Sequence, residues 1–462
     1  MSTWSAEVVE RRNILRMLLL AVLVVSGGYL AIAWVNAPTN ATAAAANQTQ
    51  LPLEDRTPVV EDRGGATVIT TDPPAGSDGL GAIVAFSADG RPLYHNDTYG
   101  NYFDVDPDPP GSKTVLYVAG SRYDSCPDRL QAERDSAGDD GCAEVAVERV
   151  NLTTGTTERL HTAVTGWDIW HDVDRIDDHR LLVADIARDR VFTLNTTTDE
   201  VTWEWRAEED LDPDSGGQPG DWTHVNDVEL LEDGRVMVSL RNQDRVAFLE
   251  PGDGLQRDWT LGAEDAYGIL YEQHNPDYIP SARGGPAVIV SDSENNRVVE
   301  YQRQNETWMR TWEWQDERLQ WPRDADRLPG SHTLVTDSKG DRVLELSETG
   351  DVVWSVDIAT PYEAERLGTG DESTTGRSTA ALANGSVDAT AAETDRTSKT
   401  GLSWLVAFIT GPVVNGVLHA APTWMTIGDL LVAGVFGITA VTGGIAEVYW
   451  SGVGRRLLER LR

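Results

Sequence analysis

The chain has 462 residues, with 75 acidic side chains against 38 basic ones and a formal net charge of −37 at pH 7. This length allows two or three ordinary domains or one large one, and the charge would repel phosphate, which excludes nucleic acid as a partner. Only three of the basic residues are lysines, Lys113, Lys339 and Lys399. An acidic surface poor in lysine stays hydrated in concentrated salt and is typical of halophilic proteins.

The first element in chain order is an apolar segment from Met17 to Val35, preceded by three arginines. Its length suits the hydrocarbon core of a bilayer, and the arginines favour a cytoplasmic N-terminus with the following chain outside. Arg11 and Arg12 also resemble a twin-arginine export signal, and residues 41–46 resemble a cleavage region. We predict a retained anchor over residues 1–36, because the apolar run is longer than the core of most signal peptides; a cleaved signal is the alternative.

Two low-complexity segments frame the central part of the chain, residues 66–366. Both are rich in Ala, Thr, Gly, Ser and acidic residues and have no apolar period. Such segments cannot bury enough apolar surface to fold. We therefore expect residues 37–65 and 367–401 to be disordered linkers on either side of one domain.

Cysteines and sequons indicate an exported protein. The two cysteines, Cys126 and Cys142, close a short acidic loop with no third Cys and no nearby His, so we predict a disulfide and no metal or redox site there. Asn-x-Ser/Thr sequons, which mark glycosylation sites in exported proteins, recur in the expected turns and linkers. They start at Asn40, Asn47, Asn96, Asn151, Asn195, Asn305 and Asn384.

The central domain contains a repeat of about 50 residues. Each unit opens with a short motif of Asp or Asn and aliphatic residues, continues with a β-branched run and an Arg-Val pair, and carries tryptophan in a fourth strand. The opening motifs start at Asp172, Asp227, Asn275 and Asp324, the Arg-Val pairs at Arg190, Arg245, Arg297 and Arg342, and the tryptophans include Trp205, Trp259, Trp314 and Trp354. Four short strands per repeated unit predict a propeller blade.

Two further units precede these four and complete a six-bladed β-propeller, an all-β fold. One begins at Phe103-Asp104-Val105-Asp106 and contains the disulfide loop. Before it, Ala66–Thr71, Ala82–Ser87 and Pro92–His95 supply three strands of a first blade. We expect a strand from the far end of the chain to complete that blade. A β-sandwich is the alternative fold, but sandwiches lack a period of this length.

The C-terminal membrane region, residues 402–462, contains two apolar runs and a basic tail. Arginines after the last run favour a cytoplasmic tail, so we predict one transmembrane helix at about 430–446. The earlier run, Leu402–Ala421, is broken by Gly411-Pro412 and is expected to be interfacial or re-entrant. A second crossing there is the alternative, and it would leave the basic tail outside.

Residues at one repeat position converge in a propeller, because the innermost strands line a single channel. The position before each opening motif, together with two neighbours, supplies His171, His224, Asn226, Arg241, His274 and Arg323. Two interpretations are open. The residues form an imidazole-rich, cationic pocket for an anionic oxyester, or they are polar groups that hydrogen-bond adjacent blades. We expect structural roles for the other histidines, which lie in turns or near the membrane segments.

Three segments resemble the arylsulfate sulfotransferase family: Thr223-His224-Val225-Asn226-Asp227, Ser239-Leu240-Arg241-Asn242-Gln243 and Glu272-Gln273-His274-Asn275. These enzymes are exported six-bladed propellers that move sulfuryl groups between phenols without a nucleotide donor. The resemblance covers roughly residues 81–366. Together with the acidic, lysine-poor composition and the apolar ends, it leads us to expect a haloarchaeal, membrane-anchored member of the family, although the family's known enzymes are soluble and periplasmic. It implies that His274 is a transiently sulfated nucleophile, that His224, Asn226 and Arg241 hold the sulfate oxygens, and that His171 is a further pocket residue. We add Arg323 as a substrate-binding cation.

The implied reaction transfers a sulfuryl group from a phenolic sulfate ester to a phenolic acceptor, with no cofactor and no metal. His224 would protonate the leaving phenolate and then deprotonate the acceptor. The expected partners are small aryl sulfates, phenols and the cell membrane, with the propeller on the extracellular side. The alternatives are a non-catalytic surface binding propeller and a quinone-dependent dehydrogenase, which needs more blades and a calcium site.

Overall fold

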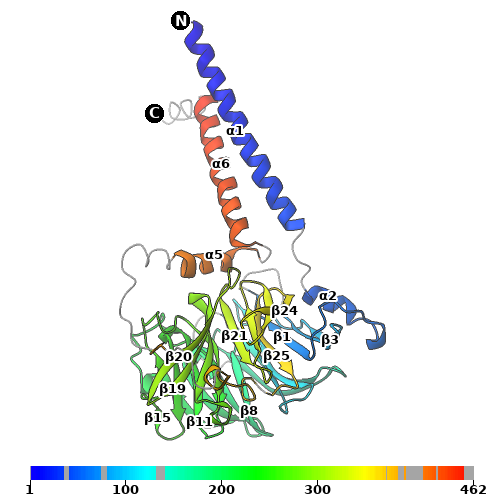
Figure 1. Cartoon of the computed structure of the whole chain (residues 1–462), viewed down its shortest axis with the longest axis vertical. Coiled ribbons are helices and arrows are strands. Elements are labelled where there is room, and N and C mark those ends of the chain that lie inside the picture. The colour runs from blue at the N-terminus through cyan, green and yellow to red at the C-terminus, as the bar shows by residue number, and fades with distance from the viewer. Residues whose placement is uncertain are drawn as a thin grey trace. The chain divides into compact units, whose positions relative to one another are not determined.

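The computed structural model describes residues 2–35, 41–73, 81–131, 141–370, 372–382, 390–391, 409–422 and 425–451. The chain divides into two compact units, Thr39–Asn415, and Met1–Pro38 together with Gly416–Arg462. The larger unit is a six-bladed β-propeller, and the smaller one holds two long apolar helices (Figure 1). The predicted fold class is confirmed.

Each blade is an antiparallel sheet whose innermost strand lines the channel. The first blade contains β25 (Pro361–Leu367), β1 (Ala66–Thr71), β2 (Ile83–Phe86) and β3 (Pro92–Asn96), and the second β4 (Asn101–Pro107), β5 (Thr114–Tyr123), β6 (Cys142–Asn151) and β7 (Thr156–Thr165). The third contains β8 (Asp172–Asp177), β9 (Arg180–Asp185), β10 (Arg190–Asn195) and β11 (Glu200–Arg206), and the fourth β12 (Val225–Leu230), β13 (Val236–Leu240), β14 (Arg245–Glu250), β15 (Gly254–Leu255) and β16 (Leu261–Gly262). The fifth contains β17 (His274–Ile279), β18 (Ala287–Asp292), β19 (Arg297–Gln304), β20 (Thr307–Trp314) and β26 (Thr390–Ala391), and the sixth β21 (Pro322–Arg327), β22 (Thr333–Asp337), β23 (Arg342–Leu346) and β24 (Val352–Asp357).

The first blade closes the ring with a strand from the far end of the chain, as expected. β25 pairs antiparallel with β1, and Ala66 lies opposite Leu367 and Ile69 opposite Ala364. The pairing removes two free sheet edges at once, which is how closed β architectures avoid edge-to-edge aggregation.

The repeated Arg-Val pair follows a turn with a local cause. The residue before each arginine has a left-handed backbone, with φ of 48° at Asp189, 53° at Asp244, 52° at Asn296 and 51° at Asp341. Asp and Asn tolerate this conformation better than other residues with a side chain. In three blades the arginine Nε then folds back on an aspartate five residues earlier, at 2.7 Å for Arg190 and Asp185, 2.6 Å for Arg297 and Asp292, and 2.7 Å for Arg342 and Asp337.

Apolar side chains pack between neighbouring blades. Six buried clusters lie one at each blade interface; for example, Phe103, Val118 and Val173 join the second and third blades. Burying one such side chain stabilises the fold by roughly 1.5–3 kcal/mol. The core is therefore a ring of six interfaces around the channel.

Carboxylates of the innermost strands link neighbouring blades. Their oxygens accept hydrogen bonds from backbone N–H groups of the neighbouring innermost strand, which satisfies donors that the sheet ladder leaves open. The bonds run from Val173 N to Asp104 (3.3 Å), Val228 N to Asp172 (2.5 Å), Tyr278 N to Glu229 (2.8 Å), Ala364 N to Asp324 (3.2 Å) and Val105 N to Glu363 (3.1 Å).

The fourth blade departs from the predicted strand pattern. Trp259, expected in its outer strand, lies in a loop between the short strands β15 and β16. Its ring lies between two guanidinium groups, 3.7 Å from Arg235 and 4.3 Å from Arg303. Cation–π contacts and packing against Phe248, not strand pairing, hold the ring in place.

Part of the expected N-terminal linker packs on the propeller. Ala41–Gln48 form helix α2, and its Ala41 and Ala45 are buried in the cluster that includes Ile69 and Trp354. Leu53–Asp55 form a single 3-10 turn. Alanine has the highest helix propensity, so a segment that lacks large apolar residues can still fold when a surface is available to it.

The expected C-terminal linker also contacts the propeller where it is described. Ser373 Oγ donates to Asp277 Oδ2 at 2.5 Å, and the short helix α3 (Thr379–Leu382) follows. Residues 37–40, 371, 383–389 and 392–401 of the two expected linkers lie outside the described residues.

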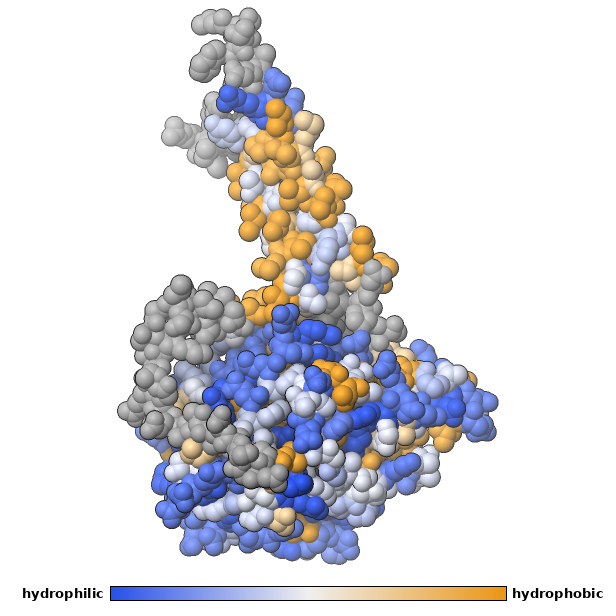
Figure 2. Space-filling model, in the orientation of Figure 1, coloured by the Kyte–Doolittle hydropathy of each residue, from blue (hydrophilic) through white to orange (hydrophobic). Residues whose placement is uncertain are grey.

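The smaller unit pairs helices α1 (Ser2–Val35) and α6 (Ile427–Ser451) antiparallel. Arg16 Nη2 lies 2.7 Å from Glu447 Oε2, and Gly27 lies against the ring of Phe436. Glu10–Val35 and Ile427–Ser451 are long and apolar enough to cross a membrane. Figure 2 shows hydrophobic residues covering these helices, whereas hydrophilic residues dominate the visible face of the propeller.

The other C-terminal apolar run is described only from residue 409 onward. Ile409–Val413 form a π-helical turn and Val414–Ala420 form helix α5. Asn415 Nδ2 donates to Glu294 Oε2 of the propeller at 2.8 Å. Residues 402–408 and the basic tail after residue 451 lie outside the described residues, so an interfacial run and a cytoplasmic tail stay predictions.

The predicted disulfide is present between Cys126 and Cys142, which are 16 residues apart. Replacing both cysteines by serine should lower the free energy of unfolding by about 3 kcal/mol, because the bridge removes loop entropy from the unfolded chain. Thermal unfolding of the double variant and of the reduced wild-type protein should show matching losses. Equal melting temperatures with and without reductant would contradict the prediction.

Candidate functional site

The predicted column residues come together at one end of the channel, where the innermost strands begin. His171 precedes β8, His224 precedes β12, and His274 is the first residue of β17. The ring centroids of His171 and His224 are 5.7 Å apart. Arg241 and Arg323 both act electrostatically on His224 and on His274, so the two guanidinium groups and the imidazoles share one volume. We call these five residues, with Asn226, the histidine pocket.

β-Bulges at the starts of the innermost strands shape this pocket. The pairing register shifts between Val225 and Asp227 in β12, between His274 and Asp277 in β17, and between Pro322 and Asp324 in β21. Bulges turn side chains out of the sheet's alternation and are frequent beside active sites. The backbone is also left-handed at His224, with φ of 50°, which costs roughly 1–3 kcal/mol that the surrounding fold must offset.

All three histidines are anchored through Nδ1. The Nδ1 atoms lie 2.9 Å from the carbonyl oxygen of Ile169, 2.8 Å from Oδ1 of Asp221 and 2.8 Å from Oγ of Ser293 for His171, His224 and His274, respectively. A carbonyl or carboxylate oxygen accepts, so Nδ1 of His171 and of His224 carries the proton. Nε2 of each ring is then the atom with a free lone pair.

The contact at Ser293 sets the tautomer of His274. Ser293 Oγ donates its single hydrogen to the carbonyl oxygen of Pro322, at 2.7 Å. The same Oγ must therefore accept from His274, which puts the imidazole proton on Nδ1 and leaves Nε2 unprotonated. An unprotonated Nε2 is the form of histidine that can act as a nucleophile.

Burial keeps the pocket imidazoles neutral. His274 is 3% exposed, and burial, together with the positive charges of Arg241 and Arg323, holds its pKa well below the usual range. Burial and Arg241 do the same to the pKa of His224. Burial lowers the pKa of His171 to about 4. At neutral pH the imidazoles therefore offer lone pairs and the arginines supply the positive charge.

Each of the two arginines pairs with a carboxylate and has one N–H group that is left without a partner. Arg241 pairs with Glu272, and Arg323 Nη1 lies 2.8 Å from Asp72 Oδ2. Nε of both arginines is buried and has no hydrogen-bond partner among the described residues. A buried donor without a partner costs about 1–3 kcal/mol, a cost that a bound anion would relieve. The carboxylates therefore orient the guanidinium groups and leave an N–H on each for an oxyanion.

Asn226 occupies a more structural position than the other predicted residues. It is fully buried, and its Nδ2 donates to the carbonyl oxygen of Gln273 at 3.2 Å, directly before His274. Gln273 in turn donates through Nε2 to Ser239 Oγ and to the Arg245 carbonyl oxygen. Asn226 thus ties β12 to the backbone that carries His274.

The pocket contains residues that the sequence argument did not name. Asp221 supports His224, and Asp168 Oδ1 accepts from Arg122 Nε at 2.8 Å. Both aspartates lie three positions before a pocket histidine, and this repeated Asp-x-x-His spacing was a readable signal. Burial raises the pKa of Asp221 to about 6, which still leaves it ionised at neutral pH.

Aromatic and cationic groups from other blades complete the pocket. Arg323 lies 4.6 Å from the ring centroid of Tyr362 and 4.8 Å from that of Trp321. Lys339 Nζ lies 5.6 Å from the Trp321 ring, and burial lowers the lysine pKa to about 8. The Tyr362 hydroxyl is buried and has no hydrogen-bond partner among the described residues.

An open cavity of about 660 Å³ adjoins the histidine pocket. Arg241, Glu272 and Asp221 belong to its lining, so the cavity reaches the pocket from the outside. Tyr267 and Tyr271 also line it, and their rings stack with centroids 4.1 Å apart. A cavity with a stacked tyrosine pair offers a surface on which an aromatic ring can pack.

Other histidines of the propeller have structural contacts. His161 stacks on Trp170 with 5.7 Å between the centroids, and His332 Nδ1 lies 2.6 Å from Glu345 Oε1.

Part of the propeller is similar to a known enzyme family. The sequence model of the family described as arylsulfotransferase (ASST) matches residues 153–275. This segment contains His171, His224, Asn226, Arg241 and His274. Arg323 lies beyond it. No curated protein matches the sequence.

Solved structures similar to the chain share little sequence with it. A protein of unknown function from Bacteroides caccae has 9% identity and a TM-score of 0.44, and covers 65% of this chain and 98% of its own. A periplasmic gluconolactonase from Pseudomonas aeruginosa has 15% identity and a TM-score of 0.42, with 66% and 99% covered. A virginiamycin B lyase from Staphylococcus aureus has 7% identity and a TM-score of 0.36, with 62% and 84% covered. None of these similarities bears on function.

The depressed pKa of His274 predicts a pH-dependent stability. The unfolded histidine takes up a proton near pH 6.5, while the folded one does so only at lower pH. Above about pH 6.5 the neutral form of His274 costs the folded state nothing. As the pH falls from there toward the pKa of the folded state, the free energy of unfolding decreases by up to about 1.4 kcal/mol per pH unit. The stability difference between wild type and His274→Asn should therefore shrink between about pH 7 and about pH 5.

Chemical denaturation at several pH values measures this difference. His179→Asn, which replaces an exposed histidine in a turn, is the control and should show no comparable change. A difference for His274→Asn that stays constant across the range would contradict the assignment of a buried neutral imidazole.

Proposed function

We propose that the protein is an arylsulfate sulfotransferase that moves a sulfuryl group from a phenolic sulfate ester to a phenolic acceptor through a sulfated His274. The observation that carries the proposal is His274, held by Ser293 with Nε2 unprotonated, beside two arginines that each keep a buried N–H without a partner. The match of residues 153–275 to the arylsulfotransferase family supports the same chemistry.

In the first half of the proposed reaction, Nε2 of His274 attacks the sulfur of the aryl sulfate. The N–S bond forms as the S–O bond to the phenol breaks, and the phenolate leaves with the electrons of that bond. Arg241 and Arg323 neutralise the sulfuryl oxygens, which carry the charge of a loose, in-line transfer. His171 and Asn226 complete the wall of this pocket.

His224 handles the proton in both halves of the proposed reaction. Burial and the charges of Arg241 and Arg323 lower the His224 pKa. A bound sulfate ester offsets the charges of the two arginines, which raises this pKa and favours uptake of a proton by the imidazole. It gives this proton to the leaving phenolate and becomes neutral. The neutral ring then takes the proton of the acceptor phenol, whose oxygen attacks sulfur and frees His274. Asp221 stabilises the imidazolium form of His224 before the first transfer and after the second.

The proposal also includes the location of the enzyme and the site where the aryl groups bind. We infer that α1 and α6 anchor the propeller to a membrane and that the disulfide marks its side as extracellular. The cavity with Tyr267 and Tyr271 would receive the aryl groups. A net charge of −37 suits a halophilic, archaeal source, so the assays below use molar KCl.

The nucleophile is tested by a stopped-flow assay of the full-length protein with a chromogenic aryl sulfate and no acceptor. We expect a burst of about one phenolate per active site, because the sulfated histidine accumulates when no phenol removes the sulfuryl group. His274→Ala should abolish the burst, and His332→Ala should retain it. A burst that persists in His274→Ala would disprove the nucleophile, and no burst from any folded variant would favour a non-catalytic binding propeller.

The tautomer argument is tested with two buried serines of β18 and the turn after it. Ser293→Ala removes the acceptor for His274 Nδ1–H and should slow transfer about tenfold, the equivalent of one hydrogen bond. Ser291→Ala is the matched control, because the Ser291 hydroxyl is buried and has no hydrogen-bond partner among the described residues. Equal rates for the two variants would refute a role for Ser293 in orienting His274.

A further inference from the structure

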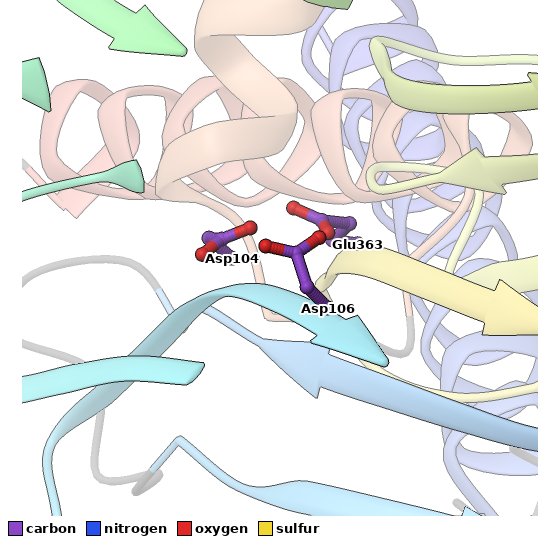
Figure 3. Close-up of side chains that lie close together, drawn as sticks. All are labelled: Asp104, Asp106 and Glu363. Atoms are coloured by element: carbon purple, nitrogen blue, oxygen red, sulfur yellow. The ribbon is translucent and has the colours of Figure 1, made fainter. Parts of the chain in front are cut away.

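Deeper in the channel, below the histidine pocket, the innermost strands carry two groups of carboxylates. One group is Asp104, Asp106 and Glu363, and the other is Asp277, Asp324 and Asp326. Within each group, one oxygen of every residue lies within 4.8 Å of the others, and all six residues are buried. Figure 3 shows the carboxyl groups of the first group gathered together, with Asp104 and Asp106 from β4 and Glu363 from β25. We call the six residues the channel carboxylates.

The inter-blade hydrogen bonds use only part of the acceptor capacity of this region. Asp326 is 2% exposed, and its Oδ2 has no hydrogen-bond partner among the described residues. Asn275, 6% exposed, donates through Nδ2 to Glu363 Oε2 at 3.0 Å, while its own Oδ1 lacks a partner within the described part of the chain. Both atoms are hydrogen-bond acceptors that no described donor satisfies. Because Asn275 Oδ1 is an amide oxygen outside the two carboxylate groups, it is an observation independent of them.

Repulsion among these buried carboxylates destabilises the folded state unless a counterion or a proton offsets it. Within each group, three buried carboxylates place oxygen atoms within 4.8 Å of one another. Like charges at this distance repel strongly in a buried site, because the surroundings screen them poorly. Either protons or cations must offset this charge.

We propose that the channel carboxylates bind Ca²⁺, one ion at each group, with Asn275 Oδ1 as a neutral ligand. All the donors are hard oxygen atoms, which excludes a preference for soft or imidazole-binding metals. Oxygens that bind Ca²⁺ at about 2.3–2.6 Å can lie up to about 5 Å apart across the ion. Mg²⁺ is smaller and retains several waters, whereas a cage of buried protein oxygens suits Ca²⁺.

The proposal departs from the expectation of no metal that we drew from the sequence. Each group joins an Asp-x-Asp pair on one innermost strand to a carboxylate on another: Asp104 and Asp106 of β4 with Glu363 of β25, and Asp324 and Asp326 of β21 with Asp277 of β17. The ions would act on the blade-to-blade contacts, and they would take no part in sulfuryl transfer. The test below therefore does not depend on activity.

Metal content and thermal stability of the full-length protein test the site. In molar KCl, the protein as purified should contain about one or two Ca²⁺ per chain by elemental analysis. After treatment with EDTA, added Ca²⁺ should raise the melting temperature by about 5 °C at 100 times its Kd, because it binds only the folded state. Mg²⁺ at the same concentration should have a smaller effect.

The variant Asp326→Asn distinguishes a carboxylate that binds a cation from one that has only a structural role. The variant keeps the shape of the side chain but removes a buried charge, so in EDTA it should be at least as stable as the wild type. In Ca²⁺ the order should reverse, because the variant has lost a ligand. Asp106→Asn tests the other group in the same way, and Asp253→Asn, at an exposed turn, should follow the wild type under both conditions.

Three results would overturn the proposal. If no Ca²⁺ copurifies and none shifts the melting temperature, protons neutralise the channel carboxylates. If Ca²⁺ stabilises Asp326→Asn and Asp106→Asn as much as the wild type, the ion binds elsewhere. A larger shift with Mg²⁺ than with Ca²⁺ would refute the choice of metal.

Discussion

The hydrogen bonds from backbone amides of one innermost strand to carboxylates of the next hold the propeller in register. Asp172 accepts from Val228, and Glu363 accepts from Val105, so the blades that these bonds join are held against rotation relative to one another. Five of the six residues of the histidine pocket lie at the starts of innermost strands, and Arg241 lies in the turn after β13. Any slip between blades would therefore separate His171, His224 and His274, and the geometry of the pocket depends on the acidic interior.

This arrangement puts opposite charges at two depths of one channel. Imidazoles and guanidinium groups lie at the mouth, and carboxylates fill the interior. A sulfate at the mouth would feel the interior charge strongly, because electrostatic interactions are poorly screened in a buried site. Asp72 and Glu272 further offset the two arginines. Neutralising the interior would thus favour anion binding even without direct contact between the two regions.

The fold and most residues of the histidine pocket could be predicted from the sequence because both follow the repeat. The opening motifs recur about every 50 residues and the first unit lacks a fourth strand, so the six blades, the closing strand and the convergence of His171, His224 and His274 were predictable. Asp72 could not be found this way, because its partner Arg323 lies 251 residues away and no repeat relates them. Ser293 lies in a turn between the second and third strands of its blade, where local sequence gives no indication of a contact with His274. Helix α2 was missed because composition alone ignores the surface on which a segment can pack.

Closure by β25 has a consequence for the order of assembly. β1 and β25 are separated by almost the whole propeller, so joining them closes a very long loop, and such non-local pairing is slow. Until residues 361–367 are available, the edge of β1 stays open and Tyr362 and Glu363 are missing from the channel. A nascent chain can therefore form individual blades early, but the side of the channel that Tyr362 and Glu363 supply can be completed only after β25 has paired with β1.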